Sequence, residues 1–110
     1  MTLTEKHCVP CEGGVPPLTE NEENRFLAEL DDWEIVRGAV HKIRKEFMLK
    51  TFRNAVAFIN NIADLAEEEN HHPELHINYR RVTVELSTHA ILGLSENDFI
   101  VAAKIDALME

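Results

Sequence analysis

The longest regular hydrophobic pattern in the chain runs from Thr51 to about Asn70. Its apolar residues recur at the i, i+3, i+4, i+7 spacing of one helix face, at Phe52, Ala55, Val56, Ile59, Ile62, Ala63 and Ala66. Pro73 disfavours helical backbone at His72, so we expect this helix to end near His71. A long amphipathic helix of this kind should lie across a sheet and supply much of the hydrophobic core.

Four stretches predict strands, at about 33–36, 39–49, 75–80 and 82–88. The last one alternates strictly between apolar and polar residues, as a strand with one buried face does. His89 follows it on the polar side, at the rim of the sheet. Between the first two strands, Arg37-Gly38 predicts a hairpin turn in which Gly38 supplies a positive φ. Tyr79 shares a face with the apolar residues of the third strand and is expected to pack there.

Two capping-box pairs predict two further helices, Thr19 with Glu22 and Ser95 with Asp98. The second of these helices is apolar on almost every side, which predicts burial on more than one side and hence a subunit interface. Asp98 is either only the capping partner of Ser95 or also a site residue. The element order α-β-β-α-β-β-α favours the α+β class, with an antiparallel sheet and helices packed on one face.

Length and charge limit the candidate partners. The chain has 110 residues and a formal net charge of −9, which predicts one domain. We place that domain at 19–110, after an irregular arm, 1–18, that Pro and Gly punctuate. Direct binding to nucleic acid or to an anionic membrane is not expected of so acidic a chain. No apolar run approaches the roughly 18 residues of a membrane span, and the first residues do not resemble a signal peptide, so we expect a cytoplasmic location.

Candidate chemistry lies at the helix-to-strand corner, where His71 and His72 are adjacent and where His89 ends a neighbouring strand. Imidazole is the side chain whose pKa lies nearest neutrality, so clustered histidines suit proton transfer. Hairpin strands lie about 4.8 Å apart, so the three imidazoles can face one pocket. Glu67, one helical turn before His71, can accept a hydrogen bond from an imidazole.

The same residues form a longer signature with fixed intervals. It consists of Glu67-x-x-x-His71-His72-Pro73, Tyr79, His89 and Asp98, with Leu86-Ser87-Thr88-His89 and Gly93-Leu94-Ser95-Glu96 around them. This signature resembles that of the pterin-4a-carbinolamine dehydratases, also called dimerization cofactors of a hepatic transcription factor, from roughly residue 19 to the end. The chain departs from familiar members at Asn70, often Asp, and at Leu75, often Trp. The first departure could reorient an imidazole, and the second could alter a pocket wall.

The resemblance implies a hydro-lyase, a 4a-hydroxytetrahydrobiopterin dehydratase. Such an enzyme converts a 4a-hydroxytetrahydropterin to the quinonoid dihydropterin and water in tetrahydrobiopterin recycling, with neither metal nor organic cofactor. It also implies a four-stranded sheet and assembly as a homodimer or homotetramer. His71, His72 and His89 would be catalytic, with His72 and His89 as the main acid and base and His71 in support. Glu67 and Asp98 would bind the substrate.

Two other functions stay open. Cys8 and Cys11 form a C-x-x-C pair that could be half of a zinc site, and a metal-binding module would join them to two histidines such as His71 and His72. A second C-x-x-C pair is missing, which favours the simpler interpretation of a loosely docked arm that carries two free thiols. The other function is a non-enzymatic interaction protein whose apolar C-terminal helix binds a partner helix.

Overall fold

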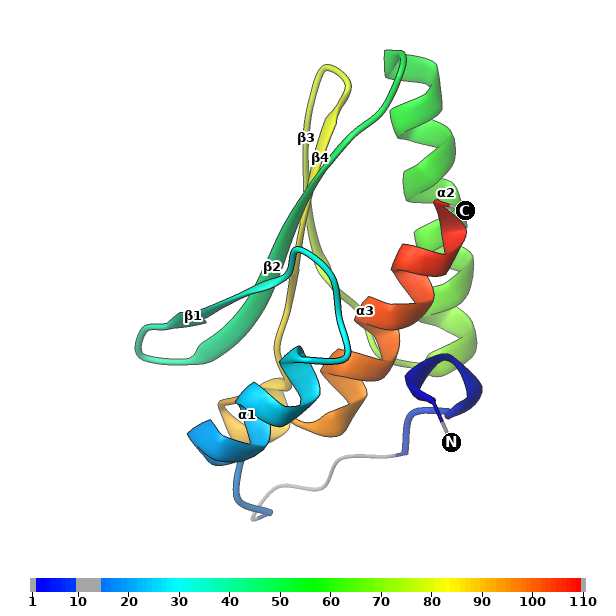
Figure 1. Ribbon diagram of the computed structural model, residues 1–110. Coiled ribbons are helices and arrows are strands. Elements are labelled where there is room, and N and C mark those ends of the chain that lie inside the picture. The colour runs from blue at the N-terminus through cyan, green and yellow to red at the C-terminus, as the bar shows by residue number, and fades with distance from the viewer. Residues whose placement is uncertain (1, 10–14, 110) are drawn as a thin grey trace.

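The fold is a four-stranded antiparallel sheet with its helices on one face (Figure 1). The computed structural model describes residues 2–9 and 15–109. The strands lie in the order β1-β2-β4-β3, and every pairing is antiparallel. In chain order the elements are η1 (Leu3–Glu5), α1 (Glu20–Leu27), β1 (Glu34–Arg37), β2 (His41–Met48), α2 (Phe52–Glu69), β3 (Glu74–Asn78), β4 (Arg81–Leu86), η2 (His89–Ile91) and α3 (Glu96–Leu108). The predicted α+β class is confirmed, and two short 3-10 turns, η1 and η2, are added to the predicted order.

The hydrophobic core fills the space between the sheet and the helices. Residues from both layers are 5% exposed or less, among them Ile43, Phe47, Val82, Val84, Leu86, Ala55, Phe58, Ile62, Phe99, Val101 and Ile105. Removing this apolar surface from water is the main source of stability. The buried stripe of α2 covers only part of the predicted one, because Phe52 and Val56 stay exposed. Among the residues described, none of the helices is both long and apolar enough to span a membrane.

The helix ends follow the local sequence closely. Both predicted capping boxes are confirmed, at Thr19 for α1 and at Ser95 for α3. The long helix α2 ends at Glu69, because Asn70 turns to the left-handed conformation with φ 52°. Asparagine tolerates this region better than most residues do. His71 and His72 therefore lie in the short corner between α2 and β3.

Two turns differ from the prediction. Arg37 pairs with His41, so the β1–β2 connection has three residues, and Gly38 does not adopt the predicted positive φ. A three-residue loop spreads the chain reversal over more dihedral angles than a tight two-residue turn does. At the β3–β4 turn, Tyr79 takes φ 57° and is 68% exposed, so it does not pack beside the apolar residues of β3 as predicted.

The C-terminal helix α3 is buried within its own chain. Leu3 of η1 is 4% exposed and joins the core, and η1, α1 and α2 all contact α3. Val101 and Ala102 are fully buried in this way. The prediction that α3 meets another subunit is wrong for these positions, because the arm, expected to be loosely docked, covers the helix instead.

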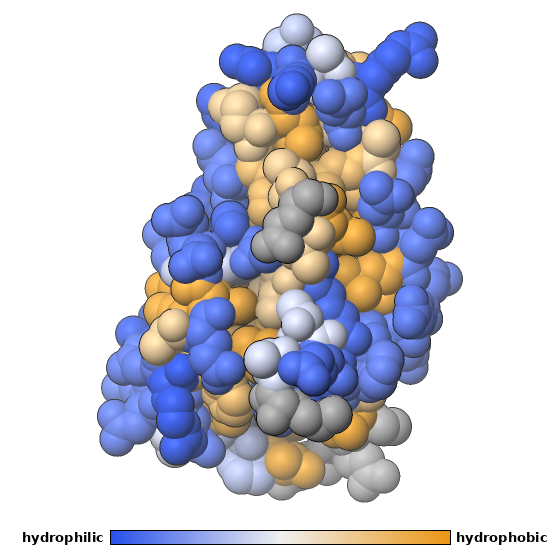
Figure 2. Space-filling model, turned by 45° about the vertical axis from the view of Figure 1, so that its right-hand side comes forward, coloured by the Kyte–Doolittle hydropathy of each residue, from blue (hydrophilic) through white to orange (hydrophobic). Residues whose placement is uncertain are grey.

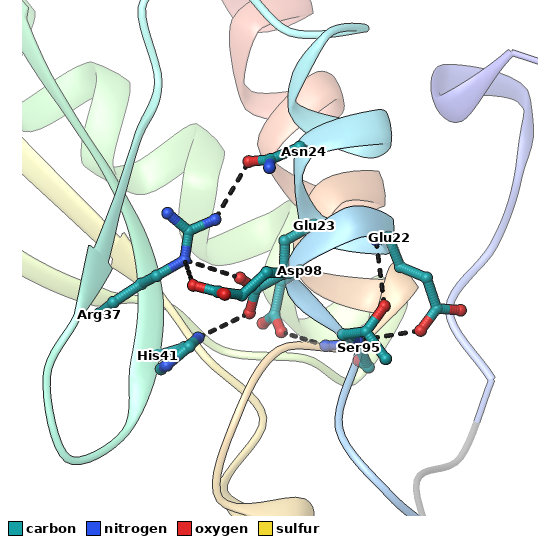
Figure 3. A network of polar contacts seen from close by, with 9 residues as sticks. Glu22, Glu23, Asn24, Arg37, His41, Ser95 and Asp98 are labelled. Carbon is teal, nitrogen blue, oxygen red and sulfur yellow. Dashed lines mark hydrogen bonds and ion pairs between the residues drawn. The ribbon is translucent and has the colours of Figure 1, made fainter.

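A buried carboxylate fastens α1 to the β1–β2 hairpin (Figure 3). Glu23, whose side chain is 1% exposed, accepts from Arg37 Nε at 3.2 Å and lies 2.8 Å from His41 Nδ1. Arg37 also donates to Asn24 Oδ1 at 3.0 Å. Because buried charges are stable only when they are paired and hydrogen-bonded, this cluster fixes the position of the hairpin relative to the helices.

Candidate active site

The three candidate histidines border one cleft of about 570 Å³. His71 and His72 follow the end of α2, and His89 begins η2 just after β4. Since β3 pairs with β4, the start of β3 and the end of β4 lie side by side, and the histidines next to them meet. The rest of the lining comes from Cys8, Val9, Glu68, Glu69, Asn70, Ser87, Thr88, Ala90 and Asn97.

His71 is held from behind by a buried aspartate. Its Nε2 atom lies 2.7 Å from Asp98 Oδ1, and Asp98 is fully buried. The other oxygen, Oδ2, accepts from Thr88 Oγ1 at 2.8 Å. It also accepts from the backbone N–H of Ser95 at 3.0 Å (Figure 3). An ionised carboxylate only accepts hydrogen bonds, so Nε2 donates and a neutral His71 keeps a lone pair on Nδ1. Asp98 thus caps α3 and orients His71 at once.

His72 is paired on the outer side of the cleft. Its Nε2 atom lies 2.6 Å from Glu67 Oε2, and both side chains are more than half exposed. Sequence spacing placed Glu67 one helical turn before His71, but the corner after α2 brings His72 to it instead. An exposed pair of this kind contributes little to stability, so its main effect is to limit the orientations of the imidazole.

His89 is exposed and connects two clefts. A second cleft of about 520 Å³ shares His72, Ser87 and His89 with the first one. Its other walls are the β1–β2 loop and the open face of the sheet, through Val36, Gly38, Ala39, Val40, Lys42, Glu74 and Glu85. The side chains of His72 and His89 therefore belong to the walls of both clefts.

The N-terminal arm lines the first cleft through Cys8 and Val9, which sequence reasoning did not foresee. The arm is fixed there by Glu69, whose side chain is 1% exposed. Glu69 accepts from the backbone N–H of Cys8 at 2.7 Å and from Lys104 Nζ at 2.7 Å, and it lies 2.9 Å from His7 Nδ1. The sequence does contain a signal for the burial of Glu69. This residue stands three positions after Ala66 and so falls on the buried stripe of α2.

Two pKa shifts follow from this arrangement. Burial alone would raise the pKa of Glu69, but hydrogen bonds from Lys104, Cys8 and His7 outweigh it, and the pKa falls to about 2. Burial, and next to it the negative charge of Glu69, raises the pKa of the Cys8 thiol to about 12. Glu69 is therefore ionised at neutral pH, while Cys8 stays protonated.

The structure does not favour a metal site at the arm. Among the described residues, Cys8, His71 and His72 do not form a group whose ligand atoms lie close enough together to share an ion. Cys11 lies outside the described residues. Within the part of the chain that the structure describes, the ligand atoms that lie close enough to hold an ion belong to Glu74, His76 and Glu85. Those residues stand on the open face of the sheet, and exposed acidic groups of this kind are common without a metal.

The two departures from the family signature have different positions. Asn70 lines the first cleft, next to the two histidines. Leu75 is half-buried and packs against the hydrophobic core. The signature residue Tyr79 lies in the β3–β4 turn at the opposite end of β3 from the histidines.

Comparison with known proteins finds one family that matches most of the chain. A family model described as "Pterin 4 alpha carbinolamine dehydratase" matches residues 16–108. A relative from Rubrobacter xylanophilus, named "Putative pterin-4-alpha-carbinolamine dehydratase", is 46% identical over 106 residues, which are 96% of this chain and 97% of the relative.

Solved structures agree with the sequence matches. A protein from Brucella melitensis described as a transcriptional coactivator/pterin dehydratase superposes with a TM-score of 0.80 at 39% identity, over 86% of this chain and 99% of that one. A pterin dehydratase-like protein described as a RuBisCO assembly factor of the alpha-carboxysome gives a TM-score of 0.61 at 25% identity, over 71% and 89% of the two chains. By sequence and by fold, the chain belongs to the pterin-4-alpha-carbinolamine dehydratase family.

Proposed function

We propose that this protein dehydrates a 4a-hydroxytetrahydropterin to the quinonoid dihydropterin, in tetrahydrobiopterin recycling, by general acid/base catalysis from histidines. The observation that carries the proposal is the meeting of His71, His72 and His89 at one cleft, in a chain of this family. Neither a metal nor an organic cofactor takes part in the proposed reaction.

The reaction needs one proton delivered and one removed. The C4a–O bond breaks, and its oxygen leaves as water only if a general acid protonates it. The N5–H bond breaks to a general base, and its electron pair forms the C4a=N5 double bond. Each role contributes typically ~10²–10⁴-fold and works best with a pKa near the working pH. His72 and His89, which border both clefts, take the main roles, and His71 supports them.

The two acidic residues have different parts in this proposal. Glu67 is exposed, pairs with His72 and keeps free lone pairs that can accept from the amino group of a pterin. Asp98 is fully buried, and both of its oxygens already have partners. We therefore assign Asp98 the positioning of His71 in place of the substrate contact expected from the family resemblance.

The proposal includes assembly as a homodimer or homotetramer. Phe52 and Val56 of α2 are exposed and border a shallow hollow together with Ala57. Figure 2, which turns α2 toward the viewer, has hydrophobic residues in a band between polar margins. In addition, β3 is an edge strand with one side unpaired in the sheet. Contiguous apolar surface and open sheet edges are typical of protein interfaces.

The test is the rate of quinonoid dihydropterin formation from a 4a-hydroxytetrahydropterin, with a chelator present and no cofactor added. We expect purified protein to exceed the spontaneous rate at least ~100-fold, the low end of general acid/base catalysis at a single residue. A rate equal to the spontaneous one would refute the proposal. Loss of the rate on adding chelator would point to a metal-dependent reaction instead.

The alternative functions have less support. The interaction hypothesis began with the apolar C-terminal helix, and the central part of that helix is buried within the chain. The metal module requires Cys8 to meet histidines such as His71 and His72, and among the described residues these three do not form a group with ligand atoms close enough to share an ion.

A further inference from the structure

Beyond the histidines, one wall of their cleft is built by the N-terminal arm. Cys8 and Val9 line the same cleft as His71, His72 and His89. We propose that Cys8 and Val9, here called the arm wall, determine substrate affinity by contacting an uncharged part of the pterin while it faces the histidines. This inference rests on the proposed dehydratase function, and it adds a binding element outside the signature that begins near residue 19.

The arm wall is held by the side chain of Asn97, which bonds to both the N–H and the carbonyl of one backbone residue, as a neighbouring strand would. Asn97 Oδ1 accepts from the backbone N–H of Val9 at 3.1 Å, and Asn97 Nδ2 donates to the backbone carbonyl of Val9 at 2.7 Å. Asn97 is itself 4% exposed. Because a buried amide that loses its partners carries a desolvation penalty, this pair of bonds fixes the backbone of Val9 at the cleft.

A second anchor acts one residue earlier. Glu69 accepts from the N–H of Cys8, and Lys104 Nζ lies 2.7 Å from the same carboxylate. Further back, Lys6 pairs with Glu96 at the start of α3. The arm therefore crosses from α2 to α3 along a series of specific contacts, and it reaches the cleft in one defined position.

Both anchors belong to segments that also carry the site. Glu69 stands two residues before His71, and Asn97 is adjacent to Asp98, which holds His71. The end of α2 and the start of α3 fix the position of His71. The same two helix ends therefore fix how far the arm wall lies from the imidazoles. A substrate placed between them would meet the arm on one side and the proton-transfer groups on the other.

The chemical character of the wall is neutral. Val9 presents an apolar side chain that is 66% exposed, and Cys8 presents a thiol rather than a thiolate. The acidic residues Glu67 and Glu68 lie nearby, at the end of α2. A carboxylate added at Val9 would lie at the same cleft as Glu68 and Glu69, and desolvating it against a ligand there would weaken binding.

The test uses one substitution at two places in the arm. Val9→Asp puts a carboxylate on the arm wall. Val15→Asp makes the same change at a residue of similar exposure that does not line either cleft. We expect Val9→Asp to raise KM about tenfold, which corresponds to ~1.4 kcal/mol, with kcat within about twofold. That split is typical of an interaction made equally in the ground state and the transition state.

Val15→Asp should leave KM and kcat unchanged. The conservative variant Val9→Ile should keep a KM near that of the wild type. Asn97→Ala, which frees the backbone of Val9, should also raise KM. Its effect should be less than additive with Val9→Asp, because both changes act on one wall. The Kd of a stable 7,8-dihydropterin should follow KM across the set.

An unchanged KM and Kd in Val9→Asp, with an active wild type, would overturn the arm wall and leave the dehydratase function standing. An equal rise in KM in Val15→Asp would also overturn it, because the effect would then come from net charge alone. A wild type without dehydratase activity would overturn both proposals together.

Discussion

At the residue scale, the carboxylate of Glu69 shows how a buried charge organises its neighbours. Three donors, from Lys104, Cys8 and His7, surround it, and its pKa lies near 2. The sequence gives little warning of this, because Glu69 ends a run of three glutamates that resembles a solvated helix face. Only the position on the buried stripe of α2 distinguishes Glu69 from Glu67 and Glu68.

The lowered pKa of Glu69 predicts a pH-dependent contribution to the stability of the fold. Glu69→Gln should lower the free energy of unfolding at pH 7 by on the order of 2 kcal/mol, since a depressed carboxylate pKa stabilises the folded state. The contribution is complete above the unfolded pKa of about 4.3 and is lost as pH falls toward 2. The difference in Tm between the two proteins should therefore be constant from pH 7 to pH 5 and smaller at pH 3.

The exposed neighbour supplies the control. Glu68→Gln removes the same charge from a solvated position and should change Tm little at any of these pH values. A difference between Glu69→Gln and the wild type that persists undiminished at pH 3 would show that the ionised carboxylate is not its source.

The placement of the three histidines at one cleft could be predicted from adjacency and strand pairing alone. His71 and His72 are neighbours in the chain, and β3–β4 pairing places His89 beside them. The arm contacts could not be predicted in this way. They depend on Asn97 and Glu69 meeting a segment about sixty to ninety residues away in sequence, and loop closure of that length leaves no local pattern.

At the element scale, helices were predicted better than turns. Periodicity and capping boxes set the helices, and both are local properties. The turn at Gly38 and the conformation of Tyr79 depend on which strand residues pair across the hairpin, and a shift of one residue changes the turn. The burial of α3 on more than one side was predicted, but what covers it was not, because part of the cover comes from an arm without any hydrophobic period.

The end of α2 offers a prediction at this scale. Asn70 occupies the left-handed region at φ 52°, where a Cβ without a local polar partner is unfavourable. Asn70→Ala should lower the free energy of unfolding by about 1 kcal/mol, whereas Asn70→Gly should be close to neutral. Denaturant unfolding of both variants measures this, with Asn60→Ala on the exposed side of α2 as the control for loss of an amide. Equal stability of the Ala and Gly variants would contradict the role given to the cap.

At the scale of the whole molecule, the chain keeps an apolar face that its own elements leave open. The arm covers α3, yet Phe52 and Val56 of α2 stay exposed together with Ile77 at the edge strand β3. Core packing and assembly can be tested separately, because Val101 is fully buried inside the chain while Val56 is 39% exposed.

We therefore expect the wild type to sediment as a dimer or tetramer, and Val56→Glu to shift it toward smaller species while the fold remains intact. Val101→Glu should unfold the chain instead, because it would bury an unpaired charge in the core. Sedimentation velocity and circular dichroism on the three proteins distinguish these outcomes. A wild type that is monomeric at high concentration would disprove the assembly.

The measurement that tests the catalytic proposal most directly is kcat/KM for dehydration in four histidine variants. His72→Ala and His89→Ala should each lower it by about tenfold to several hundredfold, in the low part of the acid/base range because a neighbouring imidazole can partly substitute. The double variant should lose more than either single one, with non-additive effects. His76→Ala, on the open face of the sheet and outside both clefts, should stay near the wild-type value. An equal loss in folded His76→Ala, or no loss in His72→Ala and His89→Ala, would contradict the assignment of the site.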